Sequence, residues 1–404
     1  MATPGFSPTP TKTTYDVVII GGAIMGSATA WFLSDNPDFN GSVLVVERDP
    51  SYAQCSTAHT NSCIRQQFSD PLNIRISQFT ARFIKELPER MNDARVPRLD
   101  VQSYGYLYLA DTEGFADVLR RNAEVQRAEG AGTEILNRAE IAARYPFYQL
   151  DDIVAGSINT RDEGYWDGGT LFDWFRRSAR DRGVEYVANE VTALTREGGR
   201  ITHVTLASGE HIACGHVVNA SGPRAARVAA MAGIEIPVEP RKRFTWVFSA
   251  ETPLDRDLPL TIDPSGVHVR QDGPTTYLAG AAPDEDLPID PGDFAMDHAR
   301  WQDHVWPILA TRIPAFEAIR VVTEWAGHYA YNTLDQNAVL GPHPEIGNFL
   351  FQNGFSGHGL QQSPAMGRGL AEWLTYGAYR SLDLTPFNFD RITEGRPMIE
   401  RAVI

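Results

Sequence analysis

A glycine-containing turn between an apolar segment and a helical segment constrains this chain more than any other feature. Residues 16–20, DVVII, form a run dominated by apolar side chains, which is typical of a buried parallel strand. The turn GGAIMG follows at residues 21–26, a helix is expected from Ser27 to Leu33, and a second apolar strand at 43–46 leads into Glu47, 21 residues after Gly26. This order of elements predicts a dinucleotide-binding βαβ unit.

Each position of the turn has its own physical task. Gly21 permits the tight turn, and Gly26 lets the helix pack closely against the strand. The helix N-terminus offers free N–H groups to a pyrophosphate, and the Glu47 carboxylate can accept hydrogen bonds from a ribose. The middle glycine of the usual pattern is replaced by Ala23. Alanine is the smallest possible replacement, so we expect a slight displacement of the ligand and not a loss of binding.

Charge and composition limit the partners of the chain. A net charge of −15 argues against nucleic acid and anionic membranes as partners. The three cysteines have no metal-type spacing, which predicts neither a metal site nor disulfides and suits a reducing compartment. There is no apolar run long enough for a transmembrane helix. Residues 1–14 are expected to be a disordered tail and not a targeting peptide, so the cytoplasm is the expected location.

The rest of the pattern predicts a mixed α/β (α+β) fold with two intertwined domains. A Rossmann-type ligand-binding domain is expected to be discontinuous, with residues 15–90, 150–235 and 330–390. An inserted substrate domain is expected from residues 91–149 and 236–329, because residues 238–278 alternate between polar and apolar side chains as in an antiparallel sheet. Residues 391–404 are expected to form a C-terminal tail.

Several ordered sequence blocks resemble one family of proteins. The glycine turn with Glu47, the Val191 strand, the turn at Ala220 to Gly222 and the C-terminal glycine loop resemble the D-amino-acid oxidase (DAO) superfamily of FAD enzymes. The blocks VVERDPSYAQCST, QQFSDP, EVQRAEGA, DEGYWD, EPRKRF, YNTLDQNAVLGPHP and GFSGHGLQQSP are most similar to a subgroup of FAD-dependent oxidoreductase domain-containing proteins, beside the sarcosine oxidases and dimethylglycine dehydrogenases. The resemblance covers nearly the whole chain and implies a glutathione reductase-like FAD-binding domain with an inserted substrate sheet.

The resemblance also implies a set of cofactor-binding residues. They surround FAD from its adenosine end to its flavin ring: Gly21, Ala23, Ile24, Met25, Gly26, Glu47, Arg48, Ser56, Thr57, His59, Thr60, Asn61, Ser62, Val191, Ala220, Gly222, Gly354, Phe355, Gly357, His358, Gly359, Leu360 and Gln361. The helix that begins near Leu360 would direct positive potential at the edge of the flavin that gains negative charge on reduction.

The chemistry implied is oxidation of the C–N bond of an amine or N-substituted amino acid to an imine. The candidate catalytic residues are Arg65, His268, Tyr331, His358 and Gln361. Arg65 could pair with a substrate carboxylate through its guanidinium fork, or it could face the surface or the pyrophosphate. His268 and Arg270 are expected on one face of a strand, which could be the pocket or a solvated face.

Two departures separate the chain from its better-known relatives. The block GHYAYNTLD at 327–335 lacks the arginine of glycine oxidase, and Gln361 replaces a lysine of monomeric sarcosine oxidase. Both familiar carboxylate anchors are therefore absent, which puts simple glycine or sarcosine in doubt as the substrate.

Other questions stay open at the level of sequence. The run Ser56-Thr57-Ala58-His59 has the spacing of a covalent histidyl attachment to flavin, although non-covalent FAD is favoured. The electron acceptor could be O2 or an electron-transfer partner. Lys242 is the one lysine that could approach the pocket, but its block does not match the lysine that activates oxygen in sarcosine oxidases. An FAD-dependent 2-hydroxy-acid or polyol dehydrogenase, or an assembly factor related to complex I assembly proteins, are the alternatives. The oligomeric state is not predicted.

Overall fold

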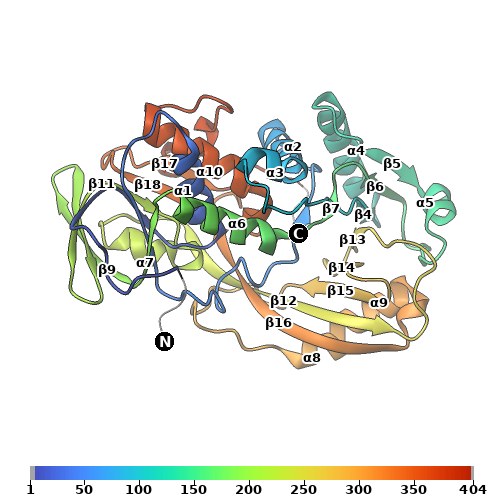
Figure 1. Cartoon of the computed structure of the whole chain (residues 1–404). Coiled ribbons are helices and arrows are strands. Elements are labelled where there is room, and N and C mark those ends of the chain that lie inside the picture. Colours follow the sequence, from blue (N-terminus) through green and yellow to red (C-terminus); the bar gives the residue numbers. More distant parts are fainter. Residues whose placement is uncertain (1–4, 402–404) are drawn as a thin grey trace.

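Two eight-stranded sheets organise residues 5–401, the part of the chain that the computed structural model describes (Figure 1). The first sheet has the strand order β17-β18-β11-β1-β2-β8, with β10 and β9 continuing from β11. Its parallel strands are β1 (Thr14–Ile20), β2 (Val43–Glu47), β8 (Glu185–Ala188), β11 (His211–Asn219) and β18 (Phe349–Asn353). Antiparallel strands extend it: β9 (Val191–Glu197), β10 (Arg200–Leu206) and β17 (Val339–Pro342).

Helices cover both faces of the first sheet. On one face lie α1 (Ile24–Asp35), α6 (Gly168–Asp181) and α10 (Gly359–Tyr376), joined by α2 (Pro71–Lys85) and α3 (Leu87–Met91). On the other face lie the short η1 (Gly222–Arg224) and α7 (Ala225–Ala230). Helix α1 is buried nearly all round because it lies between α6 and α10 as well as against the sheet, which explains why its sequence is apolar on every side.

The second sheet forms the other half of the molecule. Its strands, in spatial order, are β16 (Ile319–Asn332), β12 (Val238–Ala250), β15 (Thr276–Ala281), β14 (His268–Gln271), β13 (Leu260–Ile262), β4 (Tyr106–Ala110), β6 (Ala155–Asn159) and β5 (Glu134–Asn137). All neighbours are antiparallel except β13 and β4. Helical segments pack around it: α4 (Glu113–Ala128), α5 (Arg138–Arg144), α8 (His298–Arg300), the π-helical η2 (Trp301–Val305), α9 (Trp306–Arg312) and η3 (Pro314–Phe316). The predicted mixed fold with an inserted, largely antiparallel sheet is confirmed.

The chain changes sheets later than the sequence suggests. Strand β6 was expected in the ligand-binding piece that begins at residue 150, but it pairs with β4 and β5 in the second sheet. The return to the first sheet follows β7 (Gly164–Tyr165), which pairs with β3 (Cys63–Ile64) in a two-stranded ribbon of its own. Strand β6 pairs with β4 over five residue pairs in the second sheet. The sequence of β6 contains no apolar pattern that distinguishes it from a strand of the first sheet.

The N-terminal segment is packed against the first sheet, so the expectation of a disordered tail is wrong for residues 5–13. Phe6 is buried, and its ring lies edge-on to the ring of Tyr186, with 5.7 Å between the two ring centres. Ser7 forms a parallel bridge with Val187, and the N–H and hydroxyl of Thr11 both donate to Glu185, at 2.7 Å each. Residues 1–4 lie outside the described residues.

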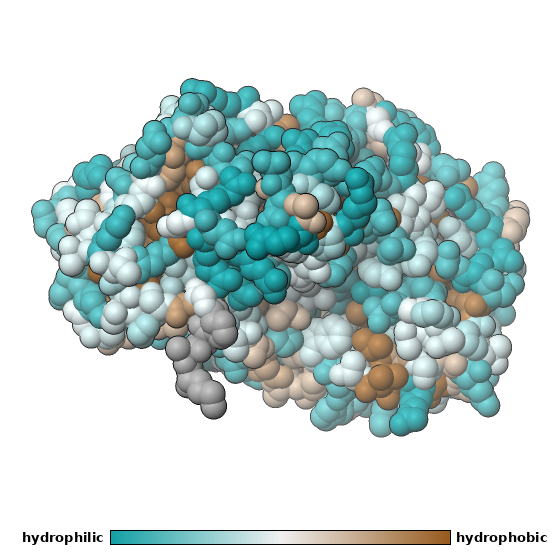
Figure 2. All heavy atoms as spheres, in the orientation of Figure 1, coloured by the Kyte–Doolittle hydropathy of each residue, from teal (hydrophilic) through white to brown (hydrophobic). Residues whose placement is uncertain are grey.

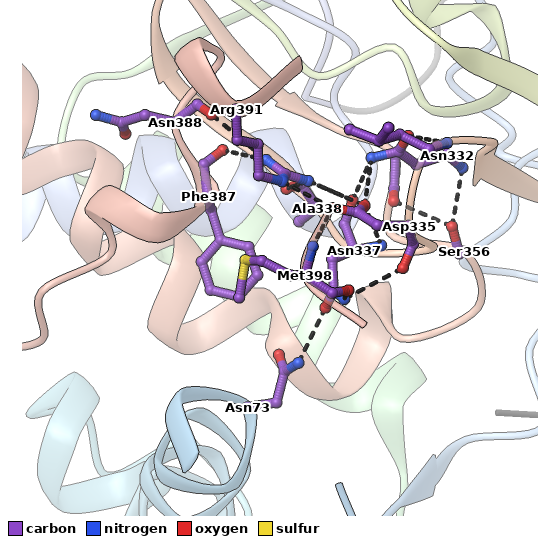
Figure 3. Close-up of polar contacts among 12 residues, drawn as sticks. Asn73, Asn332, Asp335, Asn337, Ala338, Ser356, Phe387, Asn388, Arg391 and Met398 are labelled. Atoms are coloured by element: carbon purple, nitrogen blue, oxygen red, sulfur yellow. Dashed lines mark hydrogen bonds and ion pairs between the residues drawn. The ribbon is translucent and has the colours of Figure 1, made fainter. Parts of the chain in front are cut away.

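The C-terminal segment is also tied to the first domain, through η4 (Thr385–Phe387), α11 (Asp390–Thr393) and a buried ion pair (Figure 3). Arg391 Nε lies 2.9 Å from Asp335 Oδ2, and both side chains are almost fully buried. The Arg391 guanidinium donates further to the carbonyl oxygens of Ala338 and Phe387. Asp335 also accepts from Asn332, whose backbone N–H donates to the Ser356 hydroxyl at 2.9 Å. One network therefore joins the C-terminal segment to the glycine loop at 354–359.

The visible surface is predominantly hydrophilic, with hydrophobic side chains in small separate patches (Figure 2). Among residues 5–401, no helix combines the length and the apolar character that crossing a membrane requires.

Replacing Arg391 by glutamine should destabilise the protein by about 3–5 kcal/mol, because it leaves the buried Asp335 carboxylate without a counter-charge. The matched control is Arg75→Gln, which removes an arginine that is 54% exposed from its pair with Glu129 and should cost less than about 1 kcal/mol. Urea denaturation of the purified variants measures both values. Equal effects of the two substitutions would contradict the assignment of a buried, essential ion pair.

Candidate functional site

A cavity of about 460 Å³ lies between the two sheets, within the usual range for small-molecule and cofactor sites. One end lies at the carboxyl ends of β1, β2 and β11, where open α/β sheets bind their ligands. The other end is walled by strands β12, β13, β14, β15 and β16 of the second sheet and by the start of α10. The cavity therefore runs from the glycine turn to the inserted sheet.

The glycine turn has the geometry that its sequence predicts. Gly21 has φ +101°, and a Cβ there would fall 2.5 Å from the carbonyl oxygen of Ala220. A Cβ on Gly26 would fall 1.9 Å from the carbonyl oxygen of Gly21. Ala23 caps α1 without a side-chain hydrogen bond, and the first turn of α1 carries no acidic residue. The N–H groups of the first turn of α1 are therefore not capped by a side chain of that turn.

The Glu47 carboxylate is buried at the edge of the cavity. Oε2 accepts the N–H of Gly22 and Oε1 accepts the N–H of Asp49, both at 2.8 Å. Burial raises the pKa of Glu47, and these two hydrogen bonds oppose the rise. The two backbone donors fix the orientation of the carboxylate, and each oxygen keeps a lone pair that a ribose hydroxyl could use.

The segment from Ser56 to Ser62 forms the floor of the cavity. The Ser56 hydroxyl donates to the carbonyl of His328 at 2.6 Å, and Asn61 bridges to the second sheet by contacts with Thr245 and His268. His59 lines the cavity with Nδ1 3.1 Å from the carbonyl oxygen of Cys55, which leaves Nε2 as the nitrogen without a described partner. Covalent attachment at His59 stays a prediction.

The C-terminal glycine loop closes the opposite side. Gly357 has φ +94°, and a Cβ there would lie 2.4 Å from the ring of Tyr329. The loop leads into α10, whose cap residue His358 makes no side-chain capping bond and whose first turn has no acidic residue. The 18-residue α10 therefore directs a second positive helix end at the cavity.

Arg65 is a cation that lines the cavity near the start of α10. Its side chain is only 2% exposed, and its guanidinium donates to the carbonyl of Gln67 and, from Nη2, to His358 Nε2 at 2.9 Å. The ring of Phe68 lies 4.0 Å below the guanidinium carbon. Within residues 5–401 no carboxylate forms an ion pair with Arg65. The nearby Glu163 and Glu400 carboxylates act on the Arg65 charge at a distance, without direct ion pairs.

The contacts of Arg65 define the roles of two other predicted residues. Burial and then the Arg65 charge hold the pKa of His358 well below its usual value, so the ring is neutral and accepts the hydrogen bond from Arg65 through Nε2. Gln361 Oε1 accepts the backbone N–H of Arg65 at 2.9 Å. His358 and Gln361 therefore position Arg65 from the start of α10. Burial also lowers the pKa of His268 to about 4, which leaves a second neutral imidazole in the wall.

Glu163 lies behind Arg65 and is fully buried. It accepts hydrogen bonds from the Gln66 N–H, the Gln67 side chain and the Asn159 side chain, at 2.6–2.9 Å. Burial raises the pKa of Glu163 to about 7, opposed by these hydrogen bonds and by Arg65. Its carboxyl group thus changes charge near neutral pH.

Most of the predicted site residues lie around this one cavity. Three do not line it: Gly26, Gly354 and Tyr331. Gly26 acts by packing α1 on β1, and Gly354 forms a turn with φ +69° beside Asn332. Tyr331 does not line the cavity, and the centre of its ring lies 5.1 Å from the Arg241 guanidinium carbon, so a catalytic role for Tyr331 stays a prediction without support from this geometry. Arg270 is likewise outside it, paired with Asp272 and lying over the ring of Tyr165.

The cavity also contains residues that the sequence analysis missed. Tyr106 and Tyr329 form aromatic walls, and Arg243 lies 4.6 Å from the centre of the Tyr329 ring. Arg243 forms a two-point ion pair with Asp286, at 2.7 and 2.9 Å. The block EPRKRF contains the signal for a cationic segment, but alternation alone cannot say which cation enters the cavity. Lys242 does not line it and pairs with Asp293 at 2.8 Å.

The residues present fit FAD. The turn at Gly21 to Met25 and the exposed end of α1 suit a pyrophosphate, and Glu47 suits a ribose. The floor at Ser56 to Ser62 and the positive end of α10 suit the flavin ring system.

Replacing Gly26 by alanine should abolish stable FAD binding and lower stability by about 1–3 kcal/mol, because the new methyl group collides with the Gly21 carbonyl. The matched control is Gly114→Ala in α4, where a Cβ meets no atom within 4 Å. That helical substitution should be neutral or stabilising. The flavin content of the purified variants and their thermal unfolding report the outcome. A Gly26→Ala protein that retains FAD would refute the close-packing role.

Glu163→Gln should change the pH dependence of stability. Below pH 4.5, the pKa of Glu163 in the unfolded protein, the Glu163 carboxyl group is protonated in both the folded and the unfolded wild type. Between pH 4.5 and about 7, the carboxyl group stays protonated only in the folded protein. The wild type should therefore lose up to about 3 kcal/mol relative to the variant as the pH rises through this interval. Urea denaturation at a series of pH values measures the difference. The exposed Glu124→Gln serves as the control, and parallel curves for wild type and Glu163→Gln would contradict the prediction.

Comparison with known proteins agrees with this geometry. Residues 16–373 match the family described as FAD dependent oxidoreductase (DAO). The FAD-dependent oxidoreductase domain-containing protein 1 of Xenopus laevis is 38% identical over 423 residues, which cover 96% of this chain and 85% of the relative. Sarcosine oxidase subunit beta of Rhizobium meliloti is 26% identical over 389 residues, which cover 95% of this chain and 90% of the relative.

A solved structure shows the same fold over almost the whole chain. The crystal structure of L-proline dehydrogenase from P. horikoshii superposes with a TM-score of 0.83 and 26% identity, and the match covers 95% of this chain and 99% of that chain. The cavity, its glycine turn and these matches all identify the cofactor as FAD. The chain therefore belongs to the DAO family of FAD-dependent oxidoreductases.

Proposed function

We propose that this protein oxidises the C–N bond of an N-substituted α-amino acid to an imine. The observation that carries the proposal is Arg65, a buried residue that lines the cavity and forms no ion pair with a carboxylate among the described residues. A substrate carboxylate would supply the missing anion through two parallel hydrogen bonds. FAD, when bound, supplies the two-electron acceptor for the hydride that leaves the carbon beside the nitrogen.

The charges around the cavity favour a substrate with a carboxylate and a neutral amine. The acidic residues that line it are Glu47 at the end of β2, Asp49 directly after β2, and Glu190 between β8 and β9, all in the first domain. Near Arg65 the lining is cationic or neutral, with His268 and His358 both uncharged. A positive environment lowers the pKa of a bound amine, and only the neutral amine has the lone pair that the oxidation needs.

Two relatives support the substrate class. One relative is a sarcosine oxidase subunit, and one similar solved structure is an L-proline dehydrogenase. Sarcosine and proline both carry a secondary amine next to a carboxylate. The aromatic walls at Tyr106, Phe244 and Tyr329 suit the apolar part of such a molecule.

A matched panel of small molecules tests the proposal. The panel contains secondary amino acids including L-proline and sarcosine, the amines pyrrolidine and dimethylamine, which lack the carboxylate, and the hydroxy acids glycolate and L-lactate. Under anaerobic conditions, loss of the oxidised-flavin absorbance should occur with secondary amino acids alone. Reduction by hydroxy acids alone would establish the competing dehydrogenase function, and a flavin that no member reduces would favour a non-catalytic role.

Arg65→Lys should raise the KM for the amino acid about 10- to 100-fold, because lysine cannot form the two-point contact with a carboxylate. The matched control is Arg312→Lys, a buried arginine held by Asp152 and Asp263 that does not line the cavity. Steady-state kinetics of both variants measure the effect, and bound FAD confirms that each is folded. A normal KM in Arg65→Lys would remove Arg65 from substrate binding.

A further inference from the structure

A group of arginines lines the adenosine end of the cavity. Arg48, Arg224 and Arg227 all contribute to its wall. The whole chain carries a net charge of −15, so this concentration of positive charge runs against the overall balance. Arg224 and Arg227 are not among the residues that the sequence analysis assigned to the cofactor.

The order of the strands places two of these arginines on either side of the glycine turn. Strands β11, β1 and β2 are neighbours in the sheet, and the glycine turn follows the central one, β1. Arg48 directly follows β2, and Arg224 lies in the turn that follows β11. The segments are in close contact, because Ala220 N–H donates to the Ile20 carbonyl and Gly21 N–H donates to the Val46 carbonyl, both at 2.9 Å.

The three guanidinium groups differ in how their charges are balanced. Arg227 Nη2 forms an ion pair with Asp290 at 2.8 Å. Arg224 has one hydrogen bond, from Nη2 to the carbonyl of Pro291 at 3.4 Å, and no described carboxylate forms an ion pair with it. Burial lowers the pKa of Arg224, and repulsion from Arg48 and Arg227 lowers it further. Glu190 and Asp290 oppose this fall in pKa from a distance, so Arg224 is a partly buried cation that lacks a direct ion pair among the described residues.

We propose that Arg224 binds the pyrophosphate of FAD from the β11 side, opposite Arg48 on the β2 side. The N-terminus of α1 provides backbone donors between them. The anion of the cofactor then compensates the charge of Arg224, as a charge-assisted hydrogen bond to a phosphate oxygen. This role concerns only the cofactor and does not depend on which substrate the enzyme oxidises.

Binding of three probes to the full chain stripped of FAD tests the proposal. The probes are FAD, ADP, which keeps the pyrophosphate, and adenosine, which has no phosphate. Arg224→Gln should lower the affinity for FAD and for ADP about 10- to 100-fold, as expected for the loss of one contact to a charged group. The affinity for adenosine should change by less than about twofold. Raising the salt concentration should weaken ADP binding to the wild type more than to the variant, because the lost interaction is electrostatic.

Two further variants make the result decisive. Arg320→Gln removes an exposed arginine of β16 that does not line the cavity, and it should leave all three affinities unchanged. Arg224→Lys keeps the positive charge, and its affinity for ADP should be only several-fold lower than that of the wild type. Thermal unfolding without FAD establishes whether each variant is folded. If Arg224→Gln is unfolded, the ADP affinity of Arg224→Lys tests the proposal in its place. Unchanged ADP affinity would overturn the proposal, and an equal loss for adenosine would overturn it in favour of contact with the adenine.

Discussion

The close approach of Gly26 to the carbonyl of Gly21 is the contact on which the rest of the site depends. It brings α1 against β1 at the point where β1 ends, so the helix N-terminus and the carboxyl ends of three strands share one edge. Helix α10 then packs along α1, and its own N-terminus reaches the same cavity from the other side. Two helix ends without acidic residues in their first turns therefore face one space, which selects ligands with distributed negative charge.

The protein treats its buried charges in two different ways. Arg391 is neutralised by Asp335 and by several carbonyl oxygens, so it adds rigidity and leaves nothing for a ligand. Arg65 and Arg224 line the cavity and form no direct ion pair with a described carboxylate, so a bound anion would add to the hydrogen bonds that already hold them. Anions that bind there stabilise the folded state as they occupy the site. The contrast separates an arginine that stabilises the fold from the two arginines that we propose to bind ligands.

Local patterns were sufficient for the βαβ unit with its glycine turn and Glu47, because these depend on residues close together in sequence. The other cofactor residues were implied by the resemblance to a family, and their roles stay predictions. The sequence could not predict which residues along a strand reach the cavity. Tyr329 and Tyr331 have the same parity on β16, so alternation assigns both to one face but cannot show that only Tyr329 reaches the cavity. The environment of Arg243 depends on Asp286, 43 residues later. Phe6 docks through a single apolar side chain, which creates no periodic pattern.

The path of the chain has a consequence for its synthesis. The glycine turn and Glu47 emerge from the ribosome early, but β18, α10 and Arg391 follow more than 300 residues later. Until then β11 lacks one neighbour, and the apolar face of α1 that packs on α10 has no cover. Contacts so distant in sequence form slowly and leave apolar surface open to aggregation. The N-terminal half of the ligand-binding sheet is therefore completed only when β18 and α10 are available to pack on it.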